Sequence, residues 1–296
     1  MGVQTWDGGG RTLIIAHRGD TATAPENTVP AVRAARAAGA DGVEIDVRLS
    51  GDGVPVVVHD ADLRRLTGTP GRVGELPAAM LAARRVRAQR PVGRAEVLPP
   101  DAALRPPEPL GEAPLANLDE IVRACGDELL LNVELKAERD ASPRAIARLA
   151  AAVADVLRGA GLGDRLLVSS FHPLALLAMR RALPEARGAF LFEGGESLPL
   201  RSGAGALVLW PRLAVNPERK LVSNRFMARW RAVGARVHVW TVNDPREMAW
   251  MTTLGVDAVI TDEPRLLYKV EQWGAGGWRI AEGLADCADA PAVRAE

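Results

Sequence analysis

The segment GVEIDVRL at residues 42–49 decides how this chain folds. Its apolar and charged residues alternate, and in an extended strand residues two apart point to the same face. Glu44 and Asp46 therefore project together, while the valine and isoleucine side chains beside them project the other way. If the apolar side packs against a layer of helices, both carboxylates face the interior that the sheet encloses. The segment is predicted to be an interior strand that carries two buried acids.

Similar apolar runs recur along the chain, separated by helical patterns. Strands are predicted at residues 13–16, 42–49, 55–58, 129–135, 166–170, 189–192, 206–210, 237–242 and 258–261. Helices are predicted at residues 28–38, 118–125, 143–159, 173–183, 221–233, 245–254 and 264–273. Near-continuous β-branched strands separated by helices are typical of parallel sheets that are covered on both faces. Eight or nine such strands favour an α/β fold in which a single TIM (β/α)₈ barrel spans residues 11–272.

Two regions interrupt the alternation. Residues 68–114 follow the third predicted strand, lack any long periodic segment and contain seven prolines between Pro91 and Pro114. We expect a proline-rich insertion there, and long irregular loops are usually functional or mobile. Residues 273–296 are rich in alanine and glycine, and we expect them to form a flexible carboxyl-terminal tail.

The composition excludes several classes of protein. The 296 residues are 48% hydrophobic and 25% charged, as in a soluble protein with a sizeable core. A formal net charge of +0 provides no overall field that would recruit nucleic acid, and two cysteines exclude a disulfide framework. The amino terminus lacks the pattern of a signal peptide, and no apolar stretch is long enough to span a membrane. We expect a cytoplasmic protein with no nucleic-acid partner and no integral membrane segment, and the oligomeric state stays open.

A third acid is expected to join Glu44 and Asp46. In the segment NVELK at residues 132–136, the same alternation places Glu134 and Lys136 on one face of another interior strand. Three inward carboxylates repel one another and lose hydration, and a hard divalent ion removes both penalties. Ligand sets made only of oxygen suit Mg²⁺ or Ca²⁺ better than zinc. The alternative, salt bridges on a solvated strand, fits the β-branched neighbours poorly.

Two histidines end two different predicted strands and are each followed by a charged residue. Imidazoles titrate near neutral pH, so His17 and His59 could take a proton from an attacking oxygen and give one to a leaving alkoxide. Arg18 offers a planar fork for phosphate oxygens, and Lys136 offers a second positive charge. Asn27 fits either phosphate binding or capping of the helix that begins near Thr28. Together these groups are what phosphodiester hydrolysis needs.

At this point the chain resembles a known family, the glycerophosphodiester phosphodiesterases. The resemblance runs from about residue 13 to about residue 267 and is most specific in the first block. That block consists of HRG at 17–19, PENT at 25–28, GADGVEIDV at 39–47 and DGVPVVVHD at 52–60. Later segments agree in order, namely NVELK at 132–136, SSF at 169–171, VWTVN at 239–243 and GVDAVITD at 255–262.

The resemblance implies a TIM barrel that cleaves a small glycerophosphodiester to glycerol 3-phosphate and an alcohol. It implies a divalent cation, Mg²⁺ or Ca²⁺, and the following residue roles. The metal ligands would be Glu44, Asp46 and Glu134, the acid-base pair His17 and His59, and the phosphate-binding residues Arg18, Lys136 and Asn27, with Trp240 beside the glycerol.

Two other functions stay open. The same site could cleave the headgroup of a lysophospholipid, in a phospholipase D-type reaction, if an apolar slot near residues 76–92 received the acyl chain. A barrel that binds a phosphorylated metabolite without catalysis is the other alternative, and loss of one essential group would be its usual sign. The residue pattern leaves open whether water attacks directly or a cyclic phosphate forms first, and which histidine is the acid.

Overall fold

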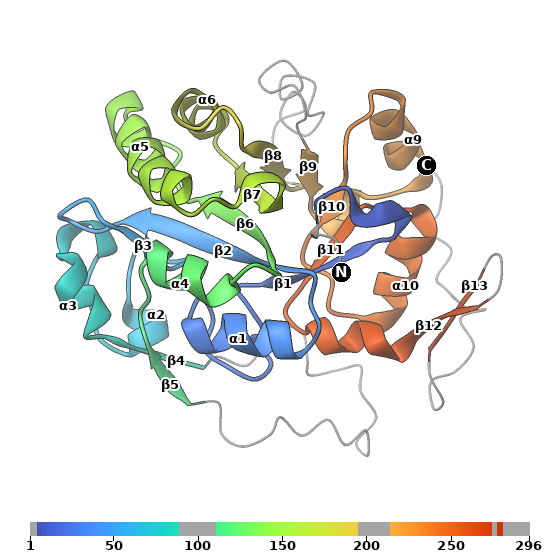
Figure 1. Ribbon diagram of the computed structural model, residues 1–296, viewed down its shortest axis with the longest axis horizontal. Helices are drawn as coiled ribbons and strands as arrows, with labels where there is room; N and C mark the ends of the chain where they lie inside the picture. Colours follow the sequence, from blue (N-terminus) through green and yellow to red (C-terminus); the bar gives the residue numbers. More distant parts are fainter. Residues whose placement is uncertain (1–4, 89–110, 195–213, 274–276, 281–296) are drawn as a thin grey trace.

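Eight parallel strands form a ring in the part of the chain that the computed structural model describes, residues 5–88, 111–194, 214–273 and 277–280 (Figure 1). The strands are β1 (Leu13–His17), β2 (Gly42–Leu49), β6 (Leu130–Leu135), β7 (Leu166–Ser170), β8 (Arg187–Phe192), β9 (Ala214–Pro217), β10 (His238–Val239) and β11 (Ala258–Thr261). They pair in the order β10-β11-β1-β2-β6-β7-β8-β9. Parallel bridges from Val215 to Val237 and from Glu218 to Trp240 join β9 to β10 and close the ring. The predicted TIM barrel is confirmed.

The alternation in β2 has the predicted outcome. Val43, Ile45 and Val47 are fully buried in the apolar layer between the strands and the helices. Glu44 and Asp46 are also buried, on the interior side of the barrel. The carboxyl end of the ring therefore receives the polar residues, as is usual for the functional face of a TIM barrel.

Helices pack around the outside of the ring (Figure 1). The six longest in the described residues are α1 (Val29–Ala37), α4 (Leu118–Cys125), α5 (Pro143–Gly159), α6 (Pro173–Ala182), α9 (Asn224–Ala232) and α10 (Pro245–Leu254). Each begins after a residue whose side chain accepts a hydrogen bond from a backbone N–H of the first turn, and four have proline in that turn. The helix of α10 ends at Gly255, where φ is +74°.

Three local predictions were wrong or untested. The helix predicted at 264–273 is instead a 3₁₀ turn, η5 (Pro264–Lys269), followed by β12 (Val270–Trp273), which pairs with the antiparallel strand β13 (Gly277–Ile280). A partner strand outweighs the weak helical pattern there. The strand predicted at 206–210 lies outside the described residues and stays untested. The strand β9 was missed, since Asn216 and Pro217 are typical of a turn. The third predicted strand, β3 (Pro55–Val57), pairs antiparallel with β2 and lies off the ring.

The region predicted to be an insertion is described only at its ends. These ends contain η2 (Val73–Glu75), α3 (Ala78–Ala82) and an antiparallel pair, β4 (Arg85–Arg87) with β5 (Glu112–Pro114). Together with β3 and α2 (Arg64–Thr67) they bury a separate apolar cluster. Residues 89–110, which hold most of the prolines, lie outside the described part, so the proline-rich insertion stays a prediction. The same is true of the tail from residue 281 and of the domain limits.

The barrel interior changes character from one end to the other. At the amino-terminal end, Leu13, Ile15, Leu167 and Ile260 pack under Trp6, whose indole N–H donates to the carbonyl of Arg165 at 2.9 Å. Toward the carboxyl end, acids and histidines replace these apolar residues. Within the described ranges, no helix combines the length and the apolar character that crossing a membrane requires.

His238 lies in the apolar end of the interior. It is fully buried, stacks on Trp6 with ring centroids 5.2 Å apart, and neither ring nitrogen has a hydrogen-bond partner among the described residues. Burial lowers the pKa of His238 to about 4, and Asp257, Arg236 and Arg187 are the charged groups that act on it. His238 therefore belongs to the core of the barrel and not to the polar cluster at its carboxyl end.

This burial predicts a pH-dependent stability. The folded pKa of about 4 is below the unfolded value near 6.5, so stability is full above pH 6.5 and falls as the pH drops toward 4. Between pH 7 and pH 4 we expect His238 to contribute a loss of about 3 kcal/mol in unfolding free energy. Denaturant unfolding of wild type and His238→Phe at both pH values measures it. If the unfolding free energy falls equally between pH 7 and pH 4 in the two proteins, the assignment is contradicted.

Candidate active site

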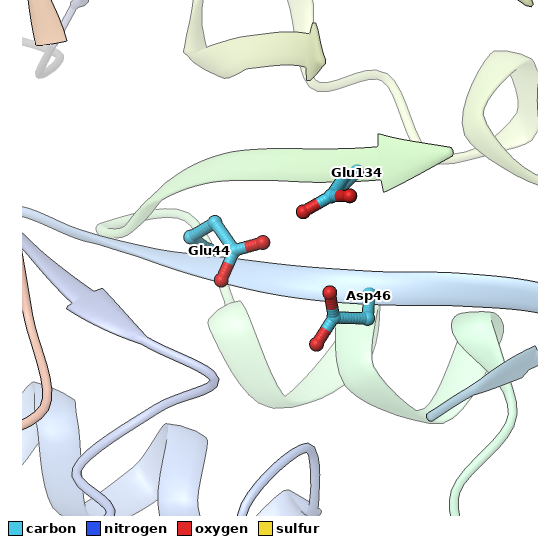
Figure 2. A group of neighbouring side chains, drawn as sticks. All are labelled: Glu44, Asp46 and Glu134. Carbon is cyan, nitrogen blue, oxygen red and sulfur yellow. The ribbon is translucent and has the colours of Figure 1, made fainter. Parts of the chain in front are cut away.

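Strand register brings the predicted site residues into two adjacent rows. His17 on β1 pairs with Glu44 on β2, and two residues further on Asp46 pairs with Glu134 on β6. Since each of these side chains alternates with an outward apolar residue, all four point into the barrel. Figure 2 shows the three carboxylates pointing toward one another from β2 and β6.

The three carboxylates form a buried cluster. One oxygen from each of Glu44, Asp46 and Glu134 lies within 4.8 Å of the others, and each residue is at most 8% exposed. Burial, reinforced by the negative charge of Asp46, raises the pKa of Glu44 to about 8, and burial also raises the pKa of Glu134. Burial alone would raise the pKa of Asp46, but the positive charges of Lys136 and Arg18 outweigh it and hold that pKa below its usual range.

This donor set fits a hard divalent cation. All the donors are carboxylate oxygens, which Mg²⁺ and Ca²⁺ prefer. One oxygen of Asp46, Oδ1, is buried and has no hydrogen-bond donor among the described residues, although Lys136 Nζ lies 3.3 Å away. Lys136 also contacts Glu134 at 2.8 Å, so one ammonium group offsets part of the negative charge.

The loop after β1 holds Arg18 in an unusual backbone conformation. Its φ is +59°, and the next residue, Gly19, has φ of +86° and lies so close to Ala31 of α1 that a Cβ there would be 2.6 Å from it. Only glycine fits that position, so the HRG sequence fixes the loop against the helix. The Arg18 guanidinium then reaches Glu26 at 2.9 Å and Asp46 at 3.1 Å.

Asn27 does not cap α1, which was one of its two predicted roles. The cap of α1 is Thr28, whose hydroxyl accepts from the N–H of Ala31. Asn27 is buried, with φ of +58°; its amide donates to Asp46 Oδ2 at 2.8 Å and accepts from the Asp46 N–H at 3.1 Å. Asn27 therefore orients a carboxylate of the cluster, and no geometry here tests contact with phosphate.

His17 is held by an acid at the end of a neighbouring strand. Its Nδ1 lies 2.6 Å from Asp262, which follows β11 and accepts a 2.6 Å hydrogen bond from Asn243. Burial and Arg18 act to lower the pKa of His17, but Asp262 and Glu44 outweigh them and raise it. The other ring nitrogen, Nε2, faces the cluster at 3.9 Å from Glu44.

His59 has a matching arrangement on the other side of the site. Its Nδ1 lies 2.6 Å from Asp60, which Arg65 contacts at 2.6 Å. Arg65 continues to Glu26 through two hydrogen bonds of 2.9 Å, and Glu26 pairs with Arg18. Burial lowers the pKa of His59, with Arg18 and Lys136 acting in the same direction and Asp46 opposing them.

These groups line one cavity of about 420 Å³ at the carboxyl end of the barrel. Trp240 borders it, with its indole N–H donating to the carbonyl of Asn216 at 2.8 Å and its ring meeting Phe171 edge to face at 5.5 Å. The predicted residues that line the cavity are His17, Arg18, Glu44, His59, Glu134, Lys136 and Trp240. Asp46 and Asn27 lie behind this surface, where they contact each other.

The supporting acids were not identified from sequence. Asp60 directly follows His59, so that pair was visible, but Asp262 is 245 residues from His17. Its position immediately after a predicted strand was the only available signal. His172 caps α6 and lies outside the cavity lining.

Comparisons with known proteins agree with this geometry. The sequence model of the glycerophosphoryl diester phosphodiesterase family matches residues 17–266. A glycerophosphodiester phosphodiesterase of Caldanaerobacter subterraneus subsp. tengcongensis is 27% identical over 89% of this chain and 99% of its own. One from Bacillus altitudinis is 28% identical over 88% and 98%. The structure of an Oleispira antarctica phosphodiesterase in complex with the product sn-glycerol-3-phosphate is 27% identical, with a TM-score of 0.71 over 87% of this chain and 96% of that one.

The electrostatics of the cluster predict that Glu44→Gln stabilises the chelator-treated protein. Glu44 has a folded pKa of about 8 and an ordinary value of 4.5, so its contribution is fully favourable below pH 4.5 and is lost as the pH rises through 8. At pH 7 a neutral glutamine avoids this loss, and we expect a gain of about 1 to 3 kcal/mol. Denaturant unfolding in excess chelator measures it. A destabilised variant under these conditions would contradict the account of mutual repulsion.

Proposed function

Because the chain belongs to the glycerophosphoryl diester phosphodiesterase family, a family of phosphoric diester hydrolases, we propose that it converts a glycerophosphodiester to glycerol 3-phosphate and an alcohol. The observation that carries the proposal is the shared cavity, in which His17 and His59 lie beside the buried carboxylate cluster. Proton-transfer groups and a candidate cation site thus face the same space. The small-molecule product bound to the Oleispira antarctica relative is consistent with this substrate class.

Glu44, Asp46 and Glu134 would hold a divalent cation, Mg²⁺ or Ca²⁺. When bound, such an ion withdraws charge from a phosphoryl oxygen and stabilises the negative charge that develops there. The chain's own contribution is to place three oxygen ligands on two rigid strands and to orient Asp46 through Asn27. Outer partners of this kind commonly change metal affinity by about 10- to 100-fold when they are lost.

The two histidines would carry the protons. One would accept the proton of the attacking oxygen, and the other would donate to the departing alkoxide. In each, Nδ1 is held by an aspartate, so Nε2 is free to act on the substrate side: Asp262 holds His17, and Asp60 holds His59. The carboxylates also favour the imidazolium form that arises during transfer.

Four residues would position the substrate. Arg18 and Lys136 present positive charge to the cavity beside the cluster and would bind the phosphate oxygens. Trp240 would contact the glycerol carbon atoms, since its N–H is already bound to a carbonyl and its ring face is apolar. Asn27, the third residue that we predicted to bind phosphate, would also hold Asp46 in place.

The two alternative functions receive no specific support. The described residues in the 76–88 segment line neither of the two cavities, and Leu76, Leu81 and Val86 pack in a separate apolar cluster, while Met80 is exposed. The described residues of this segment therefore do not line an acyl-chain slot beside the site. No group that the proposed reaction would need is missing from the described residues, which favours the catalytic proposal over a barrel that only binds.

Turnover of glycerophosphocholine tests the proposal. We expect no release of glycerol 3-phosphate from chelator-stripped protein, and restored release when Mg²⁺ or Ca²⁺ is added, because the carboxylate cluster then regains its counter-charge. An enzyme-coupled assay of glycerol 3-phosphate measures the rate. Choline release from lysophosphatidylcholine, with no ion supporting the first reaction, would replace the proposal by the lipid reaction.

Histidine variants locate the chemistry. His17→Ala and His59→Ala should each lower kcat by at least about 100-fold, the usual contribution of one proton-transfer group. His172→Asn is the matched control, since His172 caps α6, lines neither cavity, and asparagine is also a good cap. Near-normal turnover by His17→Ala or His59→Ala would contradict the site assignment.

A further inference from the structure

The cavity with the catalytic residues continues outward over the rim of the barrel. A second cavity, of about 340 Å³, shares four lining residues with the first: Arg48, Lys136, Ala137 and Glu138. It then runs between the segment 72–74 near η2 and the amino-terminal half of α5. The two cavities are therefore adjacent, and we call the second one the rim groove.

The order of the strands gives the groove a direction relative to the substrate. In the ring, β10 lies opposite β6, and Trp240 follows β10 while Lys136 follows β6. A glycerol group at Trp240 and a phosphate at the carboxylate cluster, as proposed above, leave the alcohol portion of the diester pointing over β2 and β6. That is where the rim groove begins.

An ion pair marks the entrance of the rim groove. Arg48 contacts Glu138 at 2.6 Å and donates its Nε–H to the carbonyl of His59 at 2.8 Å. Glu138 is the one acidic side chain that lines the rim groove among the described residues, and Arg48 already neutralises it. The entrance is therefore polar without a strong net charge.

Beyond the entrance, Arg72 and Arg148 supply the charged side chains among the described residues that line the groove, and the other lining residues are apolar, serine or glycine. Arg72 has only a loose contact with Glu75, at 3.6 Å, and Arg148 forms no ion pair with an acid in the described part of the chain. Arg148 leans over the turn between β2 and β3, where a Cβ on Gly53 would lie 3.4 Å from its guanidinium nitrogen. Two guanidinium groups thus border a space that a substrate's alcohol portion would enter, with no acid of the rim groove left to balance them.

We propose that the rim groove is the subsite for the leaving alcohol and that Arg72 and Arg148 select alcohols carrying an anionic group, a phosphate or a carboxylate. The inference rests on the proposed function and narrows its substrate class. Guanidinium groups bind both kinds of anion through paired N–H donors. Cationic alcohols such as choline gain nothing from this charge and are expected to be poorer substrates.

Matched substrates test the proposal directly. Glycerophosphoinositol 4-phosphate differs from glycerophosphoinositol by one phosphate, and glycerophosphoglycerate differs from glycerophosphoglycerol by one carboxylate in place of a hydroxymethyl group. We expect kcat/KM to be about tenfold higher for the anionic member of at least one pair, as two exposed ion pairs allow. Whichever pair shows the preference identifies the anion.

Two variants connect the preference to the rim groove. In the double variant Arg72→Ala/Arg148→Ala, the ratio of kcat/KM for the anionic substrate to kcat/KM for its neutral counterpart should fall to about one. Arg144→Ala is the control, because Arg144 is an exposed arginine of the same helix that lines neither cavity. It should leave the ratio unchanged.

The outcomes separate this inference from the proposed function. Hydrolysis of the neutral diesters with a ratio near one in wild type would overturn the rim groove as an anion subsite and leave the proposed function standing. A ratio that falls equally in Arg144→Ala and in the double variant would also overturn it. If no glycerophosphodiester is hydrolysed under any condition, the proposed function fails and this inference fails with it.

Discussion

The mutual repulsion of three buried carboxylates is the constraint on which the rest of the site depends. Glu44 and Asp46 share one face of β2, and strand register adds Glu134 from β6 within 4.8 Å. Folding removes the water that would otherwise screen them. Lys136 and Arg18 offset part of this negative charge through contacts with Asp46. The negative charge that remains favours binding of a divalent cation.

The positive groups are themselves held by a second layer of acids. Arg18 lies between Asp46 and Glu26, and Glu26 leads through Arg65 to Asp60 and the ring of His59. The carboxylate cluster and one histidine therefore belong to a single chain of ion pairs. In a cavity of low dielectric such a chain fixes side-chain positions more firmly than isolated surface pairs would. Geometry that has been set before the substrate arrives is what catalysis by positioning requires.

The sequence predicted the barrel because the fold depends on local alternation. The period of two in residues 42–49 placed Glu44 and Asp46 inside, whereas the roles of the histidines and of the phosphate-binding residues came from the family resemblance. Relations between distant segments were not predictable in this way. Asp262 reaches His17 only through the closure of the barrel, and the rim groove needs α5 beside the turn after β2. The strand β12 was missed because its pairing partner, rather than its own pattern, determines its conformation.

The central claim is that the three carboxylates form one cation site, and anomalous diffraction from a crystal grown with Mn²⁺ tests it most directly. Mn²⁺ takes the oxygen ligands that Mg²⁺ and Ca²⁺ take and can be located by its anomalous signal. We predict one strong peak between Glu44, Asp46 and Glu134, with metal-oxygen distances of about 2.0 to 2.6 Å. A map with no peak between these three carboxylates would contradict the account.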